Sequence, residues 1–342
     1  MQYRMMGSSD LKVSALGFGC WEMGGTYGSF DEQEVIDAIH HAIDEGVTLF
    51  DTALVYGFDP ARISWDEDRS AGAGRSERLL ARALGARRKD VIVVTKGGLP
   101  TRREQRQERD RRDSRRASLL QDIEDSLRNL NTDYIDLYLI HWPDVATPFE
   151  EAMGALNDIV AAGKARYIGV SNFSAEQLRA CRALAPICAN QVGYNLFDRR
   201  WERQMFPTAR ELGIGIMAYG PLAHGLLTGA FTPATTFEEG DWRRQGVLFG
   251  QALFQGDNFR QNLAVVERLK AVAARRGTTL PRLALAWVLA NPQVAVALIG
   301  VRRISELDDN LKALDLALTD ADRAEIDQIM AGAAGQVDAI PV

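Results

Sequence analysis

The feature that most constrains the fold of this chain is a regular alternation between short apolar runs and longer segments of helical periodicity. Eight runs of strand length lie at residues 15–19, 47–50, 91–95, 134–140, 165–170, 188–191, 214–218 and 294–299. The run 91–95, Val-Ile-Val-Val-Thr, is continuous and β-branched, which is typical of a strand. Such alternation predicts a parallel sheet in which each strand is followed by a helix.

The segments between these runs carry apolar residues at helical spacing. In the segment 31–45 these residues are Val35, Ile36, Ile39 and Ile43. Ser174 followed by Gln177 is a capping-box pattern, so a helix is predicted to begin there. The other helices are predicted near residues 75–84, 115–130, 148–162, 200–212, 259–276, 280–290, 304–314 and 319–330.

Eight strand–helix units predict a closed (β/α)8 TIM barrel that forms a single domain over residues 1–342. A β-hairpin at residues 2–14 precedes the first strand, and two helices are extra to the eightfold repeat. A doubly wound open sheet is the alternative. The dinucleotide fingerprint of that fold requires Gly or Ala where this chain has Glu22, so the barrel is favoured.

Composition limits the classes of partner. The chain has 40 basic and 46 acidic residues and a net charge of -6, which argues against a general nucleic-acid binder. No apolar run approaches the length of a membrane span, and no secretory signal is visible. Three cysteines without a CxxC pair predict neither a disulfide framework nor a zinc site. We therefore expect a cytoplasmic protein, a monomer or homo-oligomer, with no nucleic-acid or membrane partner and no metal.

Two segments interrupt the alternation. Residues 102–116 contain eight arginines with acidic residues between them, which predicts a solvated loop that forms a mobile flap near the active rim. Residues 220–258 are long enough to form a functional loop. The aromatic residues of the loops predict an apolar lid, and they are Trp65, Phe231, Phe237, Trp242 and Phe249.

Polar side chains follow the apolar runs, and in a barrel the carboxyl ends of all the strands meet at one rim. The residues at these strand ends are Asp51 with Tyr56 beyond it, Lys96, His141, Ser171, Asn172, Gln191, Tyr219, Gly300, Val301 and Arg302. Singly, each has a structural explanation as a turn or packing residue. Together, Asp51, Lys96, His141 and Tyr56 make an acid–base set.

This set suits proton donation to a carbonyl oxygen at neutral pH. A free phenol has a pKa of about 10, and a nearby ammonium group is expected to lower it. A carboxylate would hold the lysine, and a histidine would orient the carbonyl. The motifs GxSxG, HExxH and GxxxxGK[ST] are absent from the sequence. Reduction of a carbonyl also needs a hydride, so a cofactor is implied.

The chain resembles the aldo-keto reductase family over essentially its whole length. The matching motifs are Phe50-Asp51-Thr52-Ala53, Tyr56-Gly57, Thr95-Lys96, Leu139-Ile140-His141-Trp142-Pro143, residues 163–173 (GKARYIGVSNF), Asn190-Gln191 and Ala218-Tyr219-Gly220-Pro221-Leu222. The resemblance implies a (β/α)8 barrel and an NADPH-dependent carbonyl reductase that acts on a small molecule. It also relates the chain to potassium-channel β subunits, which leaves a regulatory binding subunit as the alternative function.

The resemblance also implies residue roles. Tyr56 would be the general acid, tuned by Lys96 and Asp51, with His141 orienting the substrate. Trp21, Tyr56, His141 and Trp142 would line the substrate pocket. The cofactor would contact Gly19, Cys20, Trp21, Asp51, Ser171, Asn172, Gln191, Tyr219, Gly220, Pro221, Leu222, Gly225, Leu226, Gly300, Val301, Arg302, Glu306, Asp309 and Asn310.

The sequence departs from the family pattern in the region expected to bind the adenosine 2′-phosphate. Ile299 replaces a common proline, and Glu306 stands where relatives frequently have Gln or Arg. A carboxylate there would repel the 2′-phosphate, whereas Arg302 and Arg303 would attract it. The sequence favours NADPH, with NADH as the alternative. A sugar-phosphate isomerase on the same barrel fits poorly, because that reaction needs no hydride carrier.

Overall fold

The computed structural model describes residues 1–339, except residues 26, 58–71, 103–104, 106–107, 110 and 240. Its centre is a closed barrel of eight parallel strands, and neighbours in the barrel follow the order β10-β3-β4-β5-β6-β7-β8-β9. The strands are β3 (Leu16–Gly19), β4 (Leu49–Asp51), β5 (Ile92–Gly97), β6 (Ile135–Ile140), β7 (Ala165–Ser171), β8 (Ala189–Gly193), β9 (Gly215–Tyr219) and β10 (Val294–Gly300). The predicted barrel is confirmed, and the open doubly wound sheet is excluded.

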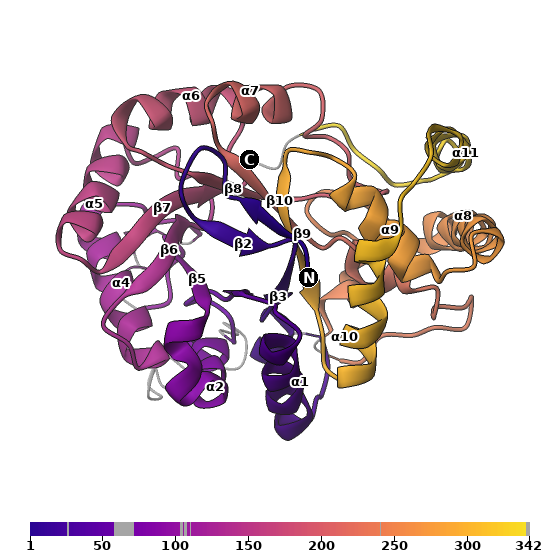
Figure 1. Cartoon of the computed structure of the whole chain (residues 1–342). Helices are drawn as coiled ribbons and strands as arrows, with labels where there is room; N and C mark the ends of the chain where they lie inside the picture. Colours follow the sequence, from indigo (N-terminus) through magenta and orange to yellow (C-terminus); the bar gives the residue numbers. More distant parts are fainter. Residues whose placement is uncertain are drawn as a thin grey trace.

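Helices surround the barrel, as Figure 1 shows. They are α1 (Glu32–Asp44), α2 (Arg75–Leu84), α4 (Arg116–Leu130), α5 (Phe149–Ala161), α6 (Ala175–Leu184), α7 (Met205–Glu211), α8 (Gly256–Arg275), α9 (Leu280–Leu289), α10 (Ile304–Leu311) and α11 (Asp320–Met330). The two extra helices are α8 and α11, which pack together at one side of the barrel. The predicted capping box of Ser174 and Gln177 is present at the start of α6.

One helix begins later than predicted. We expected a helix from residue 200, but α7 begins at Met205. The Asn195 side chain accepts a hydrogen bond from Phe197 N at 2.8 Å in a turn at residues 196–197, and a second turn occupies residues 200–204. Asparagine favours such local turns over helix because its side chain competes for backbone N–H groups.

The predicted N-terminal hairpin consists of β1 (Tyr3–Met5) and β2 (Lys12–Ser14). Met6, Leu11 and Val13 of this hairpin pack with barrel residues that include Leu137 and Met217. Ser8 N donates to Gly213 O, just before β9, so the hairpin covers the amino ends of the strands. Figure 1 shows β2 lying across the centre of the barrel. Access from solvent is therefore left to the carboxyl ends of the strands, where the predicted site residues lie.

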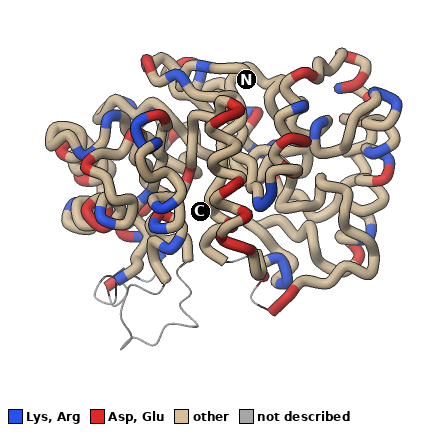
Figure 2. The backbone as a smooth tube through the Cα atoms, turned by 60° about the horizontal axis from the view of Figure 1, so that its bottom comes forward, with Lys and Arg blue, Asp and Glu red and all other residues tan. Residues whose placement is uncertain are grey.

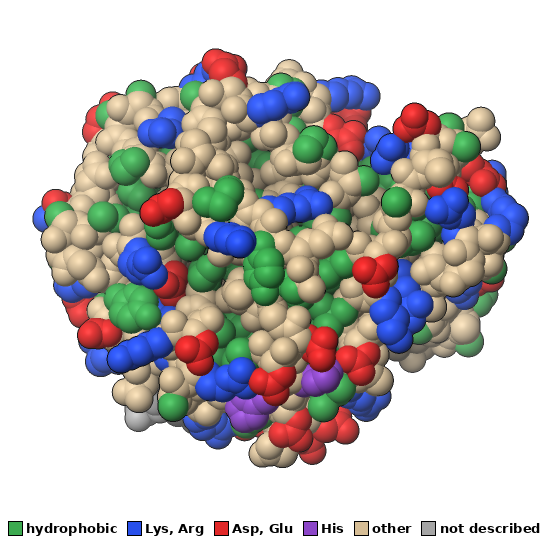
Figure 3. Space-filling view, viewed as in Figure 1, with side chains coloured by type: hydrophobic (Ala, Val, Ile, Leu, Met, Phe, Trp, Pro, Cys, Tyr) green, Lys and Arg blue, Asp and Glu red, His purple; other side chains and the backbone are tan. Residues whose placement is uncertain are grey.

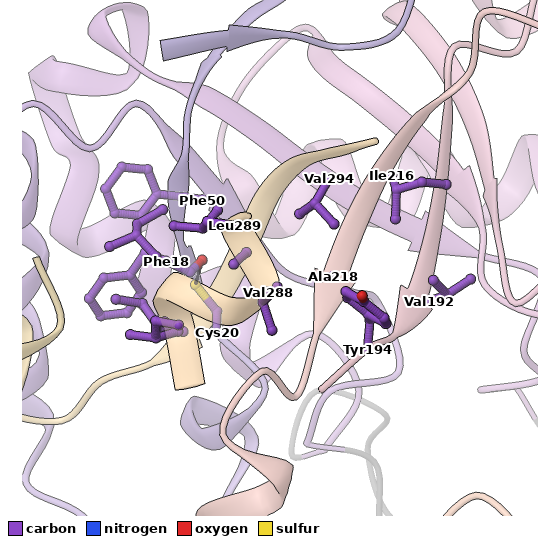
Figure 4. Packing of buried hydrophobic residues seen from close by; sticks show 14 of the residues in the cluster. Phe18, Cys20, Phe50, Val192, Tyr194, Ile216, Ala218, Val288, Leu289 and Val294 are labelled. Carbon is purple, nitrogen blue, oxygen red and sulfur yellow. Dashed lines mark hydrogen bonds between the residues drawn. The ribbon is translucent and has the colours of Figure 1, made fainter. Parts of the chain in front are cut away.

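The main core lies between the barrel and the helices. The rings of Phe18 and Phe50, from adjacent strands, stack with centroids 5.6 Å apart, and both residues are fully buried (Figure 4). Stretches of basic and acidic residues are scattered over the backbone (Figure 2). On the face shown in Figure 3, acidic and basic side chains are likewise interspersed.

The arginine-rich segment is less solvated than predicted where the structure describes it. Arg102 forms ion pairs of 2.6 Å with Asp122 and with Asp125, and its side chain is 11% exposed. Asp113 is fully buried, and its Oδ1 lies 2.8 Å from Arg115 Nε. The prediction of a solvated loop is wrong for Arg102, which carboxylates of α4 hold in a mostly buried position. The Arg115 side chain remains 34% exposed. The prediction of mobility stays untested, and part of the segment lies outside the described residues.

A buried ion pair fixes the two strands that carry Lys96 and His141. Asp136 on β6 is 2% exposed and accepts hydrogen bonds from Arg88 Nη1 at 2.8 Å and from Val93 N of β5 at 2.9 Å. We predict that Asp136→Ala lowers the free energy of unfolding by about 3 kcal/mol, because it leaves a buried guanidinium without its partner. Urea denaturation would measure this. The matched variant Asp158→Ala, which removes a half-exposed partner of Arg116, should cost less than about 1 kcal/mol.

Candidate active site

Four predicted side chains meet at the carboxyl ends of three neighbouring strands. Asp51 is the last residue of β4, Lys96 lies near the end of β5, and His141 directly follows β6. Parallel pairing aligns Asp51 with Val94 and Gly97 with Ile140, so the three strands end at similar levels. Tyr56 lies in the loop after β4, and its ring centroid is 5.8 Å from that of His141.

Lys96 is the centre of a buried hydrogen-bond network. Its Nζ donates to Asp51 Oδ1 at 2.8 Å, to Thr52 O at 2.8 Å and to the Tyr56 hydroxyl at 3.3 Å. Gln191 Nε2 donates to the second oxygen of Asp51 at 2.7 Å. The Lys96 side chain is fully buried, so these contacts compensate for removing its charge from water. The network fixes the phenol oxygen relative to the ammonium group.

Burial dominates the protonation of the two groups that face the carbonyl site. It raises the pKa of Tyr56 well above 10, and the negative charge of Asp51 adds to this shift. It lowers the pKa of His141 well below 6.5, and the positive charge of Lys96 acts in the same direction. Tyr56 is therefore a neutral phenol and His141 a neutral imidazole at neutral pH. Our expectation that Lys96 lowers the pKa of Tyr56 is wrong for the net shift, because burial outweighs an ammonium group 3.3 Å away.

Burial also shifts the pKa values of the Asp51–Lys96 ion pair toward the neutral forms. Burial raises the pKa of Asp51 and lowers the pKa of Lys96, while each partner opposes the shift of the other. The hydrogen bonds from Gln191 and to Thr52 O favour the charged forms of both groups.

A second wall of the site is formed by the ends of β7, β8 and β9. Tyr219 donates from its hydroxyl to Asn172 Oδ1 at 2.9 Å, and Asn172 Nδ2 donates to Ser171 Oγ at 3.0 Å and to His141 O at 3.2 Å. Asn172 has a φ of 65°, a left-handed conformation that asparagine tolerates. Ser171 Oγ donates to Gln191 O at 2.9 Å. This wall is thus linked to the acid–base set through both Gln191 and His141.

These two walls border a cavity of about 810 Å³, which is within the size range of cofactor and ligand pockets. The predicted site residues that line it are Gly19, Trp21, Asp51, Tyr56, His141, Trp142, Ser171, Asn172, Gln191, Tyr219, Gly220, Pro221, Leu222, Gly225, Gly300, Arg302, Glu306, Asp309 and Asn310. Lys96 lies behind Tyr56 and does not line the cavity. The side chains of Cys20, Leu226 and Val301 are also buried elsewhere; Cys20 packs beside Phe18 (Figure 4).

Glycines keep one side of the cavity free of side chains. A Cβ atom on Gly225 would lie 2.9 Å from the Phe231 ring, and one on Gly300 would clash with the Glu22 carboxylate. Gly225 also has a φ of 99°, which disfavours other residues. Glycine at these two positions therefore lets Phe231 and Glu22 lie directly against the backbone of the cavity wall.

Several cavity residues were not predicted as site residues. His224 has a φ of 56°, and its Nδ1 lies 3.3 Å from the Tyr27 hydroxyl. Burial lowers the pKa of His224 to about 3. Glu22, Tyr27, His224 and Arg243 all line the cavity, as does Phe249 of the predicted lid. The density of ring side chains in residues 220–258 was the available signal for His224. For Glu22 and Tyr27 the signal was their place in the loop of residues 22–30, which follows a strand end and was expected to border the pocket.

The aromatic residues of the predicted lid divide into two groups. Trp242 and Phe249 surround Trp21, with ring centroids 4.7 and 6.1 Å from it. Phe237 instead packs against Phe231, which lines the cavity. Trp65 lies outside the described residues.

The region expected to bind the adenosine phosphate is only partly as predicted. Arg302, Glu306, Asp309 and Asn310 line the cavity. Arg303 does not; its exposed side chain pairs with Glu34 at 3.2 Å on the outer surface. The expectation that both arginines face the phosphate is therefore wrong for Arg303.

No group of three or more His, Cys, Asp or Glu side chains is arranged to hold a metal ion in the part of the chain that is described. Among the helices of that part, none combines the length and the apolar character needed to cross a membrane.

The sequence model of the Aldo/keto reductase family matches residues 15–331 of the chain. Aldo-keto reductase YhdN of Bacillus subtilis is 36% identical over 334 residues, which cover 96% of this chain and 94% of that protein. Probable aldo-keto reductase 1 of Glycine max is 33% identical over 323 residues, covering 94% and 86%. The solved structure of the glycerol dehydrogenase AKR11B4 from Gluconobacter oxydans is 34% identical, with a TM-score of 0.81 and coverage of 98% of this chain and 97% of that one.

Proposed function

Because the chain belongs to the aldo/keto reductase family, we propose that it interconverts a small aldehyde or ketone and the corresponding alcohol with NADPH as hydride carrier, NADH being the alternative. The observation that carries this proposal is the buried cluster of Asp51, Lys96 and Tyr56 with His141 at the mouth of the cavity. When bound, the reduced nicotinamide supplies the hydride. The residues of this chain bind the reactants and supply the proton.

In the proposed reaction, Tyr56 donates its phenolic proton to the carbonyl oxygen. When hydride adds to the carbonyl carbon, the carbonyl oxygen becomes an alkoxide. An alkoxide is a much stronger base than a phenolate. The high pKa of Tyr56 keeps the proton in place until that charge develops. Lys96, 3.3 Å from the phenol oxygen, then stabilises the phenolate that remains.

The other polar residues position the reactants. His141 is neutral, so it can donate one hydrogen bond to the carbonyl oxygen without competing as an acid. Ser171, Asn172 and Gln191 offer amide and hydroxyl groups to a carboxamide, and Tyr219 offers a flat ring face beside them. Trp21, Trp142 and Phe249 exclude water from the same region; the rings of Trp142 and Phe249 stack 6.0 Å apart.

Fluorescence titration with NADPH and NADH tests this proposal, followed by activity with aldehydes, ketones, sugars and glycerol. Glycerol belongs in this panel because a protein of similar structure is named a glycerol dehydrogenase. Absence of binding for both nucleotides would overturn the proposed function. We further propose a cytoplasmic location, since all three cysteines are free thiols.

Glu306 gives a prediction about the nucleotide. Its carboxylate lines the cavity and accepts a hydrogen bond from Arg302 N at 2.9 Å. We expect Glu306→Gln to increase the affinity for NADPH relative to NADH about fivefold, since removing one repulsive charge near a phosphate contributes about 1 kcal/mol in a solvated site. Dissociation constants for both nucleotides measure the effect. Asp308→Asn, on the same helix but paired with His41 outside the cavity, is the control, and an equal ratio in the two variants would contradict the prediction.

A further inference from the structure

Arg302 is already fully engaged by the loop that follows β3. Its Nε lies 3.3 Å from Glu22 Oε2, its Nη2 donates to Tyr27 O at 2.8 Å, and its Nη1 donates to Ser29 O at 3.4 Å. All three nitrogens of the guanidinium thus have acceptors from residues 22–29. Of these acceptors, only Glu22 carries a charge.

Glu22 is fixed in this position by its surroundings. It begins the short helix η1 (Glu22–Gly24), and its carboxylate lies against Gly300, where a Cβ atom would collide with it. Its side chain is 27% exposed and lines the cavity. Burial raises the pKa of Glu22, while Arg302 opposes that shift. Without Arg302, this carboxylate would be a poorly solvated charge in the cavity wall.

Arg302 has no nearby substitute as a phosphate partner. The described arginines that line the cavity are Arg243 and Arg302. Arg243 is held by Asp241 through its Nη2 at 2.6 Å and its Nε at 3.0 Å, and it lies over the ring of Tyr27. Arg303 pairs with Glu34 outside the cavity. A phosphate at this end of the cavity therefore depends on Arg302.

We propose that Glu22 sets the nucleotide preference of the enzyme by competing with the 2′-phosphate of NADPH for Arg302. This inference rests on the proposed function. A 2′-phosphate must take Arg302 from Glu22 and then lie near a carboxylate that has lost its partner. The 2′-hydroxyl of NADH needs no cation, so it leaves the Glu22–Arg302 pair intact. Glu22 thereby weakens NADPH binding selectively and narrows the preference for NADPH over NADH.

The test is the variant Glu22→Gln, which keeps the shape of the side chain and removes its charge. Fluorescence titration should give an affinity for NADPH about tenfold higher than in the native protein, with the affinity for NADH changed less than about twofold. Glu34→Gln is the matched control, because it neutralises the carboxylate that pairs with the neighbouring arginine outside the cavity. Both nucleotide affinities of this control should stay native.

Making Glu22→Gln in the Arg302→Gln variant shows whether the change in NADPH affinity depends on Arg302. Arg302→Gln should lower the affinity for NADPH and spare that for NADH. Adding Glu22→Gln should then shift their ratio less than it does in the native background, because the competition for Arg302 is gone and only the charge repulsion remains. Equal gains for both nucleotides in Glu22→Gln would overturn the inference, because Glu22 would then act on the shared pyrophosphate. Weaker NADPH binding would also overturn it, since Glu22 would then be positioning Arg302 for the phosphate. If the native protein bound neither nucleotide, the proposed function itself would fail; the other outcomes leave that function intact.

Discussion

Replacing Tyr56 by phenylalanine is expected to lower the rate of carbonyl reduction about a thousandfold while leaving nucleotide binding and the melting temperature near their native values. The hydroxyl group is the proposed proton donor, and general acid catalysis contributes about 10²–10⁴ in rate. The ring would remain stacked with Trp21, whose centroid is 6.1 Å away, so the shape of the cavity is kept. Single-turnover reduction with saturating nucleotide measures the chemical step directly.

Tyr138→Phe is the matched control for this experiment. It removes the same hydroxyl group from a fully buried tyrosine of β6 that does not line the cavity. That hydroxyl has no hydrogen-bond partner among the described residues, so its loss should be nearly neutral or stabilising. If the Tyr56 variant kept turnover like that of the Tyr138 variant, Tyr56 would not be the acid.

The strand periodicity predicted most of the acid–base set because a parallel barrel brings strand ends together by construction. Asp51, Lys96 and His141 each stand at or beside the end of an apolar run, so their meeting needed only the fold. Tyr56 was harder to place, because it lies in a loop whose path depends on tertiary contacts. Its backbone N donates to Ala53 O at 3.0 Å, and the turn formed there directs the side chain back toward Lys96.

The charge state of the site was not predictable in the same way. A sequence shows that Lys96 is near Tyr56, but not how completely water is excluded from both. Burial reverses the expected direction of the Tyr56 pKa and makes His141 neutral. For the proposed mechanism, these shifts favour a resting site in which Tyr56 carries the proton.

Contacts between loops that are distant in the chain could not be predicted from the sequence either. Arg302 and Arg303 are adjacent and chemically identical, yet one lines the cavity and the other pairs with Glu34 of α1. The ion pair of Glu22 with Arg302 joins residues 280 positions apart. Periodicity assigns residues to strands and helices, but it does not specify which loop side chains meet above the barrel. Tertiary packing determines these contacts, and the nucleotide preference is proposed to depend on one of them, the Glu22–Arg302 ion pair.

The Asp51–Lys96 pair gives the second large expected effect, because its removal should separate stability from catalysis. Lys96→Met keeps a similar side-chain volume but leaves Asp51, whose side chain is 5% exposed, without its charged partner. We expect a loss of about 3–5 kcal/mol in the free energy of unfolding, the usual consequence of breaking a buried ion pair, and a severe loss of reduction. Urea denaturation and single-turnover kinetics measure the two effects.

The double variant Lys96→Met/Asp51→Asn distinguishes the two roles. The unpaired charge is then gone, and the amide oxygen introduced at this position can still accept the hydrogen bond from Gln191, so most of the lost stability should return. Activity should remain at the level of Lys96→Met, because no cation then lies 3.3 Å from the phenol oxygen to stabilise a phenolate. Recovery of activity together with stability would mean that the pair only supports the fold around Tyr56, and the tuning role proposed for Lys96 would have to be abandoned.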